Sequence, residues 1–257
     1  MSRMHGTKDF WIGALRADGP AFQAAVSAAA EDGDTPVPTC PGWTVADLVR
    51  HLGAAYGWIR STVSRGVTSA PERRFTGEAE GAPGWPDTVA WWAGEYTGLL
   101  ELLDAIDPEM PAWNAAPQPK KAAYWHRRVA HETAVHRWDA QFAIGAAEPL
   151  EAKQAADGIS EVVDTRLPAG VRKGPTDRHG VVHLAATDVA QEWYVRLRGE
   201  GIALLDTGTL LDSDDHHTRA QAVGTASDLL LAIYGRVQFD VVDVTGDASL
   251  LPALRTG

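Results

Sequence analysis

The sequence predicts an all-α region followed by a smaller α+β region, and two observations lead to this prediction. Up to about residue 145, apolar residues recur in helix-like segments that are separated by proline and glycine, with few alternating runs. After Pro149 the pattern changes to one helix-like stretch followed by short strand-like runs. We therefore expect two domains, with residues 1–147 forming a helical bundle and residues 148–257 forming the α+β domain.

The first region contains four helical segments. The first spans about residues 9–30 and is interrupted near Gly19 and Pro20, so it is either one helix or two short ones. A third helix follows Pro86, and a fourth covers about residues 120–144. Four helices of this length favour a bundle, in which binding sites are built from inward-facing side chains on neighbouring helices.

The second helical segment has the clearest beginning. Thr44 can cap the free amides of the first turn, and Asp47, three residues on, is well placed at the positive end of the helix. An apolar stripe then follows at three-and-four spacing: Leu48, Leu52, Ala55, Trp58 and Ile59. Since His51 falls on the same stripe, its imidazole is expected to point into the bundle.

The second region predicts a mixture of helix and sheet. A helix-like stretch covers residues 150–167, and an apolar helical run covers 227–234. Strand-like runs lie at residues 181–185, 193–197 and 239–244. A short terminal helix is expected to close the chain.

Composition and charge exclude some classes of function. The chain has 257 residues, of which 34 are Asp or Glu and 23 are Lys or Arg, giving a formal charge of −11. A negative field repels polyanions, so nucleic acid is not expected as a partner. Cys40 is the single cysteine, which excludes an internal disulfide and fits a reducing cytoplasm. The first eleven residues lack a signal-peptide core and no long apolar run follows, so neither export nor membrane spanning is expected.

Glu132 and His136 suggest a metal centre. They are four residues apart, so both side chains lie on one face of the fourth helix, where the other residues are mostly apolar. Burying such groups without partners costs several kcal/mol, and a divalent metal removes that cost by accepting their lone pairs. His51 can supply a third ligand from the facing helix. Two histidines and one carboxylate form a known catalytic arrangement for zinc and for iron(II).

A structural explanation competes with the metal. Glu132 and His136 could form a hydrogen-bonded pair on the helix, and His51 could be a satisfied core histidine. The order of residues is similar to the zincin signature His-Glu-x-x-His, but His131 and His136 are five apart and point to different faces. A zincin protease is therefore rejected.

Three segments resemble a known family. Residues 38–52 read PTCPGWTVADLVRHL, residues 127–140 read RRVAHETAVHRWDA, and residues 227–236 read SDLLLAIYGR. Together they resemble the mycothiol-dependent maleylpyruvate isomerase family of actinobacteria. The resemblance implies a DinB-like four-helix bundle that binds zinc, followed by an α+β domain likened to sterol carrier protein 2. It places the zinc ligands at His51, Glu132 and His136.

The resemblance also implies the chemistry. Members use the thiol mycothiol, and a coordinated thiol is held as the nucleophilic thiolate even though a free thiol is mostly protonated at neutral pH. The expected reaction is cis–trans isomerisation of a maleylpyruvate-like acid, or S-transfer to a small electrophile. Arg236 is the best-matched arginine for an anionic group of the substrate or cofactor, with Arg73 and Arg74 as loop candidates; each could equally be a solvated arginine. Asp139 could orient a ligand imidazole or contact the cofactor, or form a plain salt bridge with Arg137 or another arginine.

Other functions remain open at this point. A non-catalytic module that binds a metal or small ligand would use the same three side chains, and so would a DinB-like metallohydrolase that needs no thiol. The partners expected in any case are small molecules, and the protein is expected to be a monomer or a small homo-oligomer. Cys40 is assigned to packing. The adjacent pair His216 and His217 is assigned to a solvated loop, because neighbouring side chains point apart.

Overall fold

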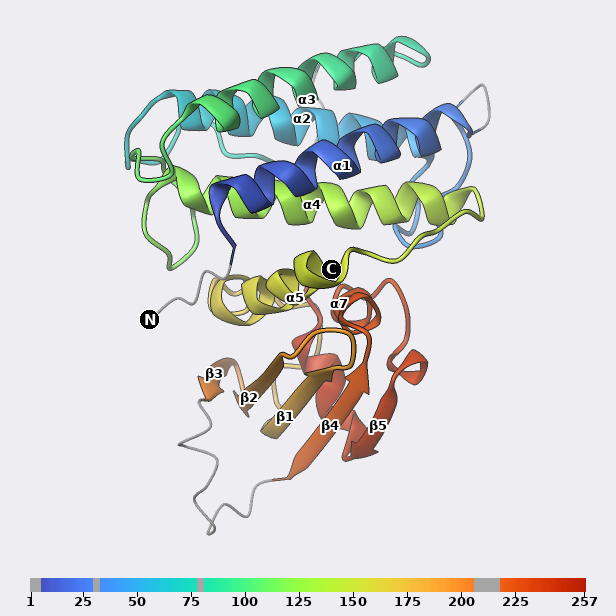
Figure 1. Cartoon of the computed structure of the whole chain (residues 1–257), viewed down its shortest axis with the longest axis vertical. Coiled ribbons are helices and arrows are strands. Elements are labelled where there is room, and N and C mark those ends of the chain that lie inside the picture. Colours follow the sequence, from blue (N-terminus) through green and yellow to red (C-terminus); the bar gives the residue numbers. More distant parts are fainter. Residues whose placement is uncertain (1–5, 30–32, 78–80, 206–217) are drawn as a thin grey trace. The chain divides into compact units, whose positions relative to one another are not determined.

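The computed structural model describes residues 6–29, 33–77, 81–205 and 218–257. By its internal contacts the chain divides into two compact units, one covering Gly6–Glu148 and the other containing Pro149–Gly257. The sequence placed the boundary near residue 147. The predicted fold class is confirmed, since a helical region precedes a domain with a mixed sheet (Figure 1).

Four helices build the first unit: α1 (Lys8–Ser27), α2 (Val45–Ser64), α3 (Asp87–Ala105) and α4 (Ala122–Ala143). The helix α1 is continuous through Pro20, so the alternative of two short helices is wrong. Proline removes one backbone hydrogen bond from a helix interior. Buried side chains on both sides of this break, Leu15 before it and Phe22 after it, hold the helix together by tertiary packing.

The beginning of α2 follows the prediction. The Thr44 hydroxyl accepts a hydrogen bond from the Asp47 amide at 3.3 Å, and the Asp47 carboxylate accepts one from the Thr44 amide at 3.0 Å. This reciprocal capping box satisfies two backbone donors that the helix leaves free. It fixes the residue at which α2 begins, and therefore the face on which His51 lies.

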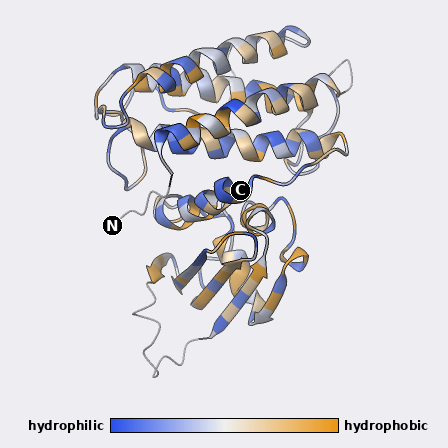
Figure 2. Cartoon of the chain, viewed as in Figure 1, coloured by the Kyte–Doolittle hydropathy of each residue, from blue (hydrophilic) through white to orange (hydrophobic). Residues whose placement is uncertain are grey.

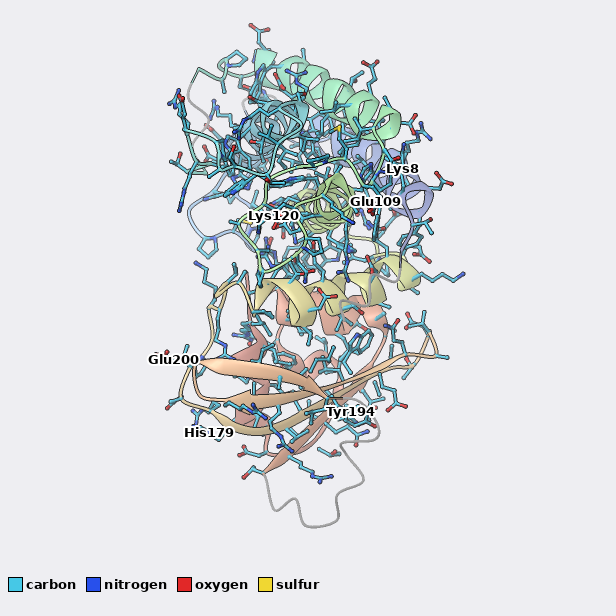
Figure 3. The ribbon with its side chains drawn as sticks, turned by 90° about the vertical axis from the view of Figure 1, so that its left-hand side faces the viewer. Lys8, Glu109, Lys120, His179, Tyr194 and Glu200 are labelled. Atoms are coloured by element: carbon cyan, nitrogen blue, oxygen red, sulfur yellow. The ribbon has the colours of Figure 1, made fainter. Side chains whose placement is uncertain are left out.

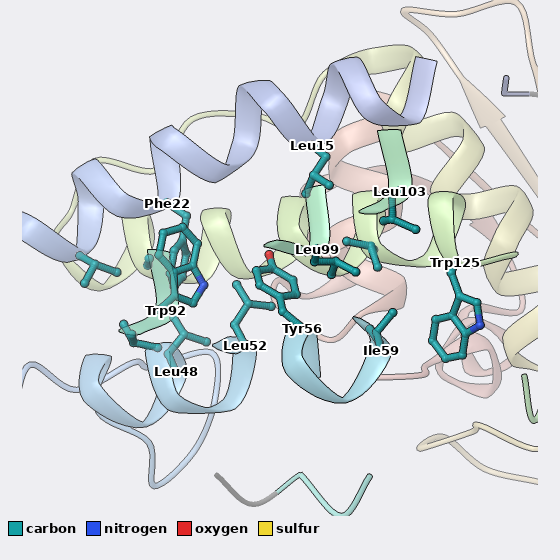
Figure 4. Close-up of a cluster of buried hydrophobic side chains, with 14 of the residues drawn as sticks. Leu15, Phe22, Leu48, Leu52, Tyr56, Ile59, Trp92, Leu99, Leu103 and Trp125 are labelled. Carbon is teal, nitrogen blue, oxygen red and sulfur yellow. The ribbon is translucent and has the colours of Figure 1, made fainter. Parts of the chain in front are cut away.

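The bundle core is aromatic as well as aliphatic (Figure 4). Trp92 of α3 contacts Phe22 of α1, with ring centroids 4.8 Å apart, and stacks on Tyr96 at 5.3 Å. Leu48 and Leu52 of α2 are fully buried in the same cluster. The aliphatic residues of the predicted stripe of α2 are thus buried in the core, and Figure 2 shows that hydrophobic and hydrophilic residues are interspersed along the helices of the bundle.

The second unit is an α+β domain. A helix α5 (Ala152–Glu161), which continues into a π-helical turn, and a helix α7 (Ala226–Ile233) pack together. The sheet has the order β3-β2-β1-β4-β5, in which only the β1–β4 pair is parallel. Its strands are β1 (His179–Ala186), β2 (Glu192–Arg198), β3 (Gly201–Leu205), β4 (Arg219–Gly224) and β5 (Asp243–Gly246).

The two faces of this sheet differ. On one face, the Trp193 indole of β2 donates to the Ser160 hydroxyl of α5 at 2.9 Å, so this helix covers the apolar side. On the other face, His183 of β1 stacks on Tyr194 of β2 with ring centroids 4.2 Å apart, and Tyr194 is visible among the strands (Figure 3). Both rings hydrogen-bond the Glu192 carboxylate. One apolar and one polar face are the usual property of a sheet that is packed on one side.

Three details of the second unit differ from the sequence prediction. Residues 239–244 are not one strand, because a 3₁₀ turn (Phe239–Val241) precedes β5. Strands β3 and β4 were missed. The sequence of β4, RAQAVG, has a single β-branched residue, and its pairing with β1 and β5 creates the strand.

The pair His216 and His217 lies outside the described residues. No helix in the described ranges is long and apolar enough to cross a membrane.

Candidate metal centre

Helices α2 and α4 bring three predicted ligands together. One carboxylate oxygen, Glu132 Oε1, lies 3.2 Å from His136 Nε2 and 3.7 Å from His51 Nε2. The two imidazole rings are 5.3 Å apart and nearly perpendicular. One donor atom from each of the three residues falls within 4.8 Å of the other two. The three side chains therefore converge on one point.

The outer nitrogens of both imidazoles face oxygen acceptors. His136 Nδ1 lies 2.9 Å from Asp139 Oδ2, and His51 Nδ1 lies 3.5 Å from the Gly77 carbonyl oxygen. An imidazole that donates through Nδ1 and is neutral has a lone pair on Nε2. Both lone pairs then point at a carboxylate oxygen that also carries lone pairs. This arrangement is repulsive unless a cation or protons lie between the groups.

Glu132 is held in its ionised form. Burial by itself would raise its pKa, but the Arg128 guanidinium and the adjacent side chains of His136 and His51 hold that pKa well below its usual value. Arg128 Nη2 lies 2.5 Å from Glu132 Oε2, the oxygen on the far side from the histidines. Arginine thus fixes one oxygen and leaves Oε1 free to face the imidazoles.

Asp139 is the anchor of His136. It is fully buried, and besides His136 it accepts a hydrogen bond from the Thr39 hydroxyl at 2.6 Å. The Cys40 thiol lies 3.6 Å from the same carboxylate. Burial alone would lower the pKa of His136, but the hydrogen bonds with Asp139 and Glu132 outweigh burial and raise that pKa. The imidazole is therefore locked in orientation from both sides.

The residues fit a small divalent cation. Zinc binds nitrogen and oxygen at about 2.0–2.2 Å, so two ligands at the tetrahedral angle are roughly 3.3 Å apart. The separations of 3.2 and 3.7 Å between Glu132 Oε1 and the two Nε2 atoms are close to this value. Two neutral imidazoles and one carboxylate are also the donor types that zinc accepts, and three protein ligands leave one position of a tetrahedron open.

Aromatic rings surround His51. Its ring lies 4.9 Å from Trp43, which precedes the helix cap, and 5.7 Å from Phe75 in the loop after α2. Phe75 in turn lies 6.0 Å from Trp58, one of the stripe residues. Such packing excludes water from one side of the imidazole and limits its rotation, which favours a preorganised ligand.

The structure places the other predicted residues as follows. Asp139 lies beside His136, as one of its proposed roles requires, whereas Arg137 donates to Asp18 of α1 at 3.1 Å. Arg236 follows α7 in the second unit, where its guanidinium donates to the Tyr234 carbonyl at 3.1 Å. Arg73 and Arg74 line a cavity between α2, α3 and the loop that connects them. Cys40 packs against the bundle core, as predicted, in addition to its contact with Asp139.

Sequence reasoning missed Thr39 and Arg128. Thr39 is 100 residues from Asp139 along the chain, so no local spacing connects them. Arg128 stands four residues before Glu132, and that spacing is the usual signal of an ion pair on a helix surface. This spacing is a sequence signal from which the contact between Arg128 and Glu132 could be predicted.

Two family models match the chain. The mycothiol maleylpyruvate isomerase N-terminal domain matches residues 13–141, and the C-terminal domain of the same family matches residues 153–253. The chain belongs to the mycothiol maleylpyruvate isomerase family. This confirms the resemblance drawn from the three sequence segments, and it makes the chain a member of an enzyme family.

Solved structures of the family have the same fold. A crystal structure of the mycothiol-dependent maleylpyruvate isomerase superposes with a TM-score of 0.66 at 12% identity, covering 95% of this chain and 96% of the other. A histidine-to-alanine mutant of the mycothiol-dependent maleylpyruvate isomerase gives 0.67 at 10% identity, with the same coverage. A search of curated proteins gave no match. At these identities the likeness concerns the fold.

Proposed function

We propose that this member of the mycothiol maleylpyruvate isomerase family is a zinc-dependent enzyme that uses mycothiol to isomerise a maleylpyruvate-like acid. The observation that carries the proposal is the convergence of His51, Glu132 and His136. Both outer imidazole nitrogens face acceptors, so two Nε2 lone pairs and one carboxylate oxygen are left to bind a cation. The thiol and the substrate class are supported by the family and by what its solved structures are called.

A metal explains the need for this particular set of side chains. Zinc at the three ligands would supply a Lewis acid that lowers the pKa of a thiol bound at the fourth position. Asp139 keeps the proton of His136 on Nδ1, so that Nε2 is available. Arg128 keeps Glu132 ionised and turned toward the histidines. The reacting sulfur belongs to the cofactor, which leaves Cys40 without a chemical role.

Elemental analysis and a thiol assay test the proposal together. Purified protein is expected to contain about one zinc per chain. With mycothiol and maleylpyruvate it is expected to form the trans isomer without consuming thiol. Consumption of mycothiol with other electrophiles would instead identify an S-transferase. Zinc without any thiol-dependent activity would favour a thiol-independent metallohydrolase or a binding module, and absence of metal from active protein would refute the metal centre.

Substitutions at Asp139 and at the neighbouring Cys40 are expected to differ in their effects on zinc affinity and activity. Asp139→Asn keeps the shape of the side chain but removes the charge, so zinc affinity is expected to fall about 10- to 100-fold, as for other partners of metal-bound histidines. Cys40→Ser is expected to retain most thiol-dependent activity, because serine can also donate to Asp139 and no chemistry is assigned to Cys40. Competition with a zinc-binding dye measures the affinities.

The two variants separate positioning from chemistry. Restoration of Asp139→Asn activity by excess zinc would show that the aspartate acts through the metal ligand. Loss of activity in Cys40→Ser, with zinc content and folding unchanged, would overturn the assignment of the sulfur to the cofactor.

A further inference from the structure

A cavity of about 890 Å³ has none of the three ligands in its lining. Its lining comes from α2, from α3 and from residues 71–76 of the connecting loop. The α2 residues in this lining are mostly small, among them Gly53, Ala54, Gly57 and Ser61. Cavities of this size are typical of sites for small molecules.

Aromatic rings form the walls. Trp91 of α3 packs directly over Gly53 of α2, where an added Cβ would lie 2.5 Å from the indole. On the other side are Trp58 and Phe75, whose ring centroids are 6.0 Å apart. The Trp58 indole donates to the Arg73 carbonyl at 2.9 Å and thereby fixes the loop against α2. The walls therefore offer flat apolar surfaces.

The lining carries three arginines, in a chain with a formal charge of −11. Arg65, Arg73 and Arg74 line the cavity, against the two acidic residues Glu72 and Glu95. Glu95 is neutralised by an ion pair with Arg60 at 3.0 Å. Arg65 and Arg74 add positive charge to this lining, which favours a negatively charged ligand.

The three arginines have different contacts. Arg65 donates to the carbonyl oxygens of Ser69 and Ala70 and so holds the start of the loop. Within the described part of the chain, Arg74 makes no hydrogen bond or ion pair. Its planar group can bind a carboxylate through two parallel hydrogen bonds.

We propose that this cavity binds a small organic anion with a flat apolar body, of which an aromatic carboxylate is the simplest form. The carboxylate would pair with Arg74, and the ring would lie against Trp58, Phe75 or Trp91. Stacking on tryptophan and phenylalanine selects a flat body, and the arginines select the charge. The site shares no residue with the three metal ligands.

The same loop links the cavity to the metal centre. Phe75 lines the cavity and lies 5.7 Å from the His51 ring, and two residues later the Gly77 carbonyl oxygen faces His51 Nδ1 at 3.5 Å. A ligand that stacks on Phe75 would hold this segment in place and so help to orient His51. This consequence, unlike the binding itself, rests on the proposed metal function.

Calorimetric titration with benzoate tests the binding, and tryptophan fluorescence follows it independently. Saturable one-to-one binding is expected for benzoate but not for benzamide, which has the same shape without the charge. Arg74→Ala is expected to weaken benzoate binding about tenfold or more. Ser61→Trp is expected to abolish it by filling the cavity, and since Ser61 is exposed the protein will still fold. The matched control is Arg16→Ala, which removes an arginine paired with Asp104 elsewhere on the bundle.

The outcomes separate this proposal from the metal proposal. His136→Ala protein is expected to bind benzoate as the unaltered protein does, because the cavity does not include that residue. In the unaltered protein, saturating benzoate is expected to shift the zinc affinity, and Ser61→Trp to remove that shift. Absence of benzoate binding, equal binding of benzamide, or equal binding by Arg74→Ala and Ser61→Trp would overturn the anion site whatever the metal content.

Discussion

Substitution of His136 by alanine is expected to reduce the zinc content from about one per chain to almost none. His136 is the most constrained of the three ligands, because Asp139 holds one ring nitrogen at 2.9 Å and the other faces Glu132 at 3.2 Å. Loss of one ligand out of three leaves a carboxylate and a single imidazole, which bind zinc much more weakly. Since a bound metal contributes several kcal/mol to catalysis, thiol-dependent turnover is expected to fall at least about 100-fold.

The fold of this variant is expected to survive. Asp139 keeps its hydrogen bond from Thr39, and Glu132 keeps its ion pair with Arg128. His179→Ala is a suitable control, because that histidine is exposed on β1 in the second unit and should leave zinc content unchanged. Elemental analysis and circular dichroism on both variants check the result. Equal zinc content and equal turnover in His136→Ala would eliminate the proposed metal centre.

Arg236→Ala is expected to reduce turnover or substrate affinity markedly while zinc content and folding remain unchanged. An acidic chain that handles an anionic substrate needs local cations at its site, since its overall field opposes the substrate. A charge-assisted contact contributes roughly 1.5–3 kcal/mol, which corresponds to a loss of about 10- to 150-fold. Steady-state kinetics with maleylpyruvate and mycothiol measure the loss. A lower kcat would show that the arginine stabilises the transition state, whereas a higher KM with unchanged kcat would show that it contributes to binding alone.

Arg236→Lys distinguishes charge from geometry. Lysine keeps the positive charge but cannot form two parallel hydrogen bonds to a carboxylate, so only part of the activity is expected to return. The guanidinium of Arg236 also donates to the Tyr234 carbonyl, at the end of α7, and thermal unfolding will show whether this contact matters for stability. Unchanged kinetics in Arg236→Ala would contradict the assignment and would direct attention to Arg73 and Arg74.

The regular parts of the fold could be predicted from local patterns. Thr44 and Asp47 mark the beginning of α2 because capping depends on residues three positions apart, and the apolar stripe of α2 shows which side is buried. Strand β4 could not be predicted in this way. Its short alanine-containing sequence has little strand preference of its own, and hydrogen bonds to β1 and β5 stabilise it.

The ligand set could be predicted for the same reason. Glu132 and His136 are one helical turn apart, which brings their side chains together whatever the rest of the chain does, and His51 interrupts an apolar stripe. The surroundings of these ligands follow no such rule. Thr39 reaches Asp139 across 100 residues, and the Gly77 carbonyl reaches His51 across 26.

By itself, then, the sequence determined the helices, their buried faces and the three side chains that meet at the candidate metal centre, because these depend on spacings within one or two turns. Only the tertiary structure decided that the Gly77 carbonyl faces His51, that Thr39 supports Asp139, and that an arginine-lined cavity adjoins the loop beside His51. Those contacts join segments far apart in the chain, and their geometry follows from how helices and loops pack rather than from any periodicity.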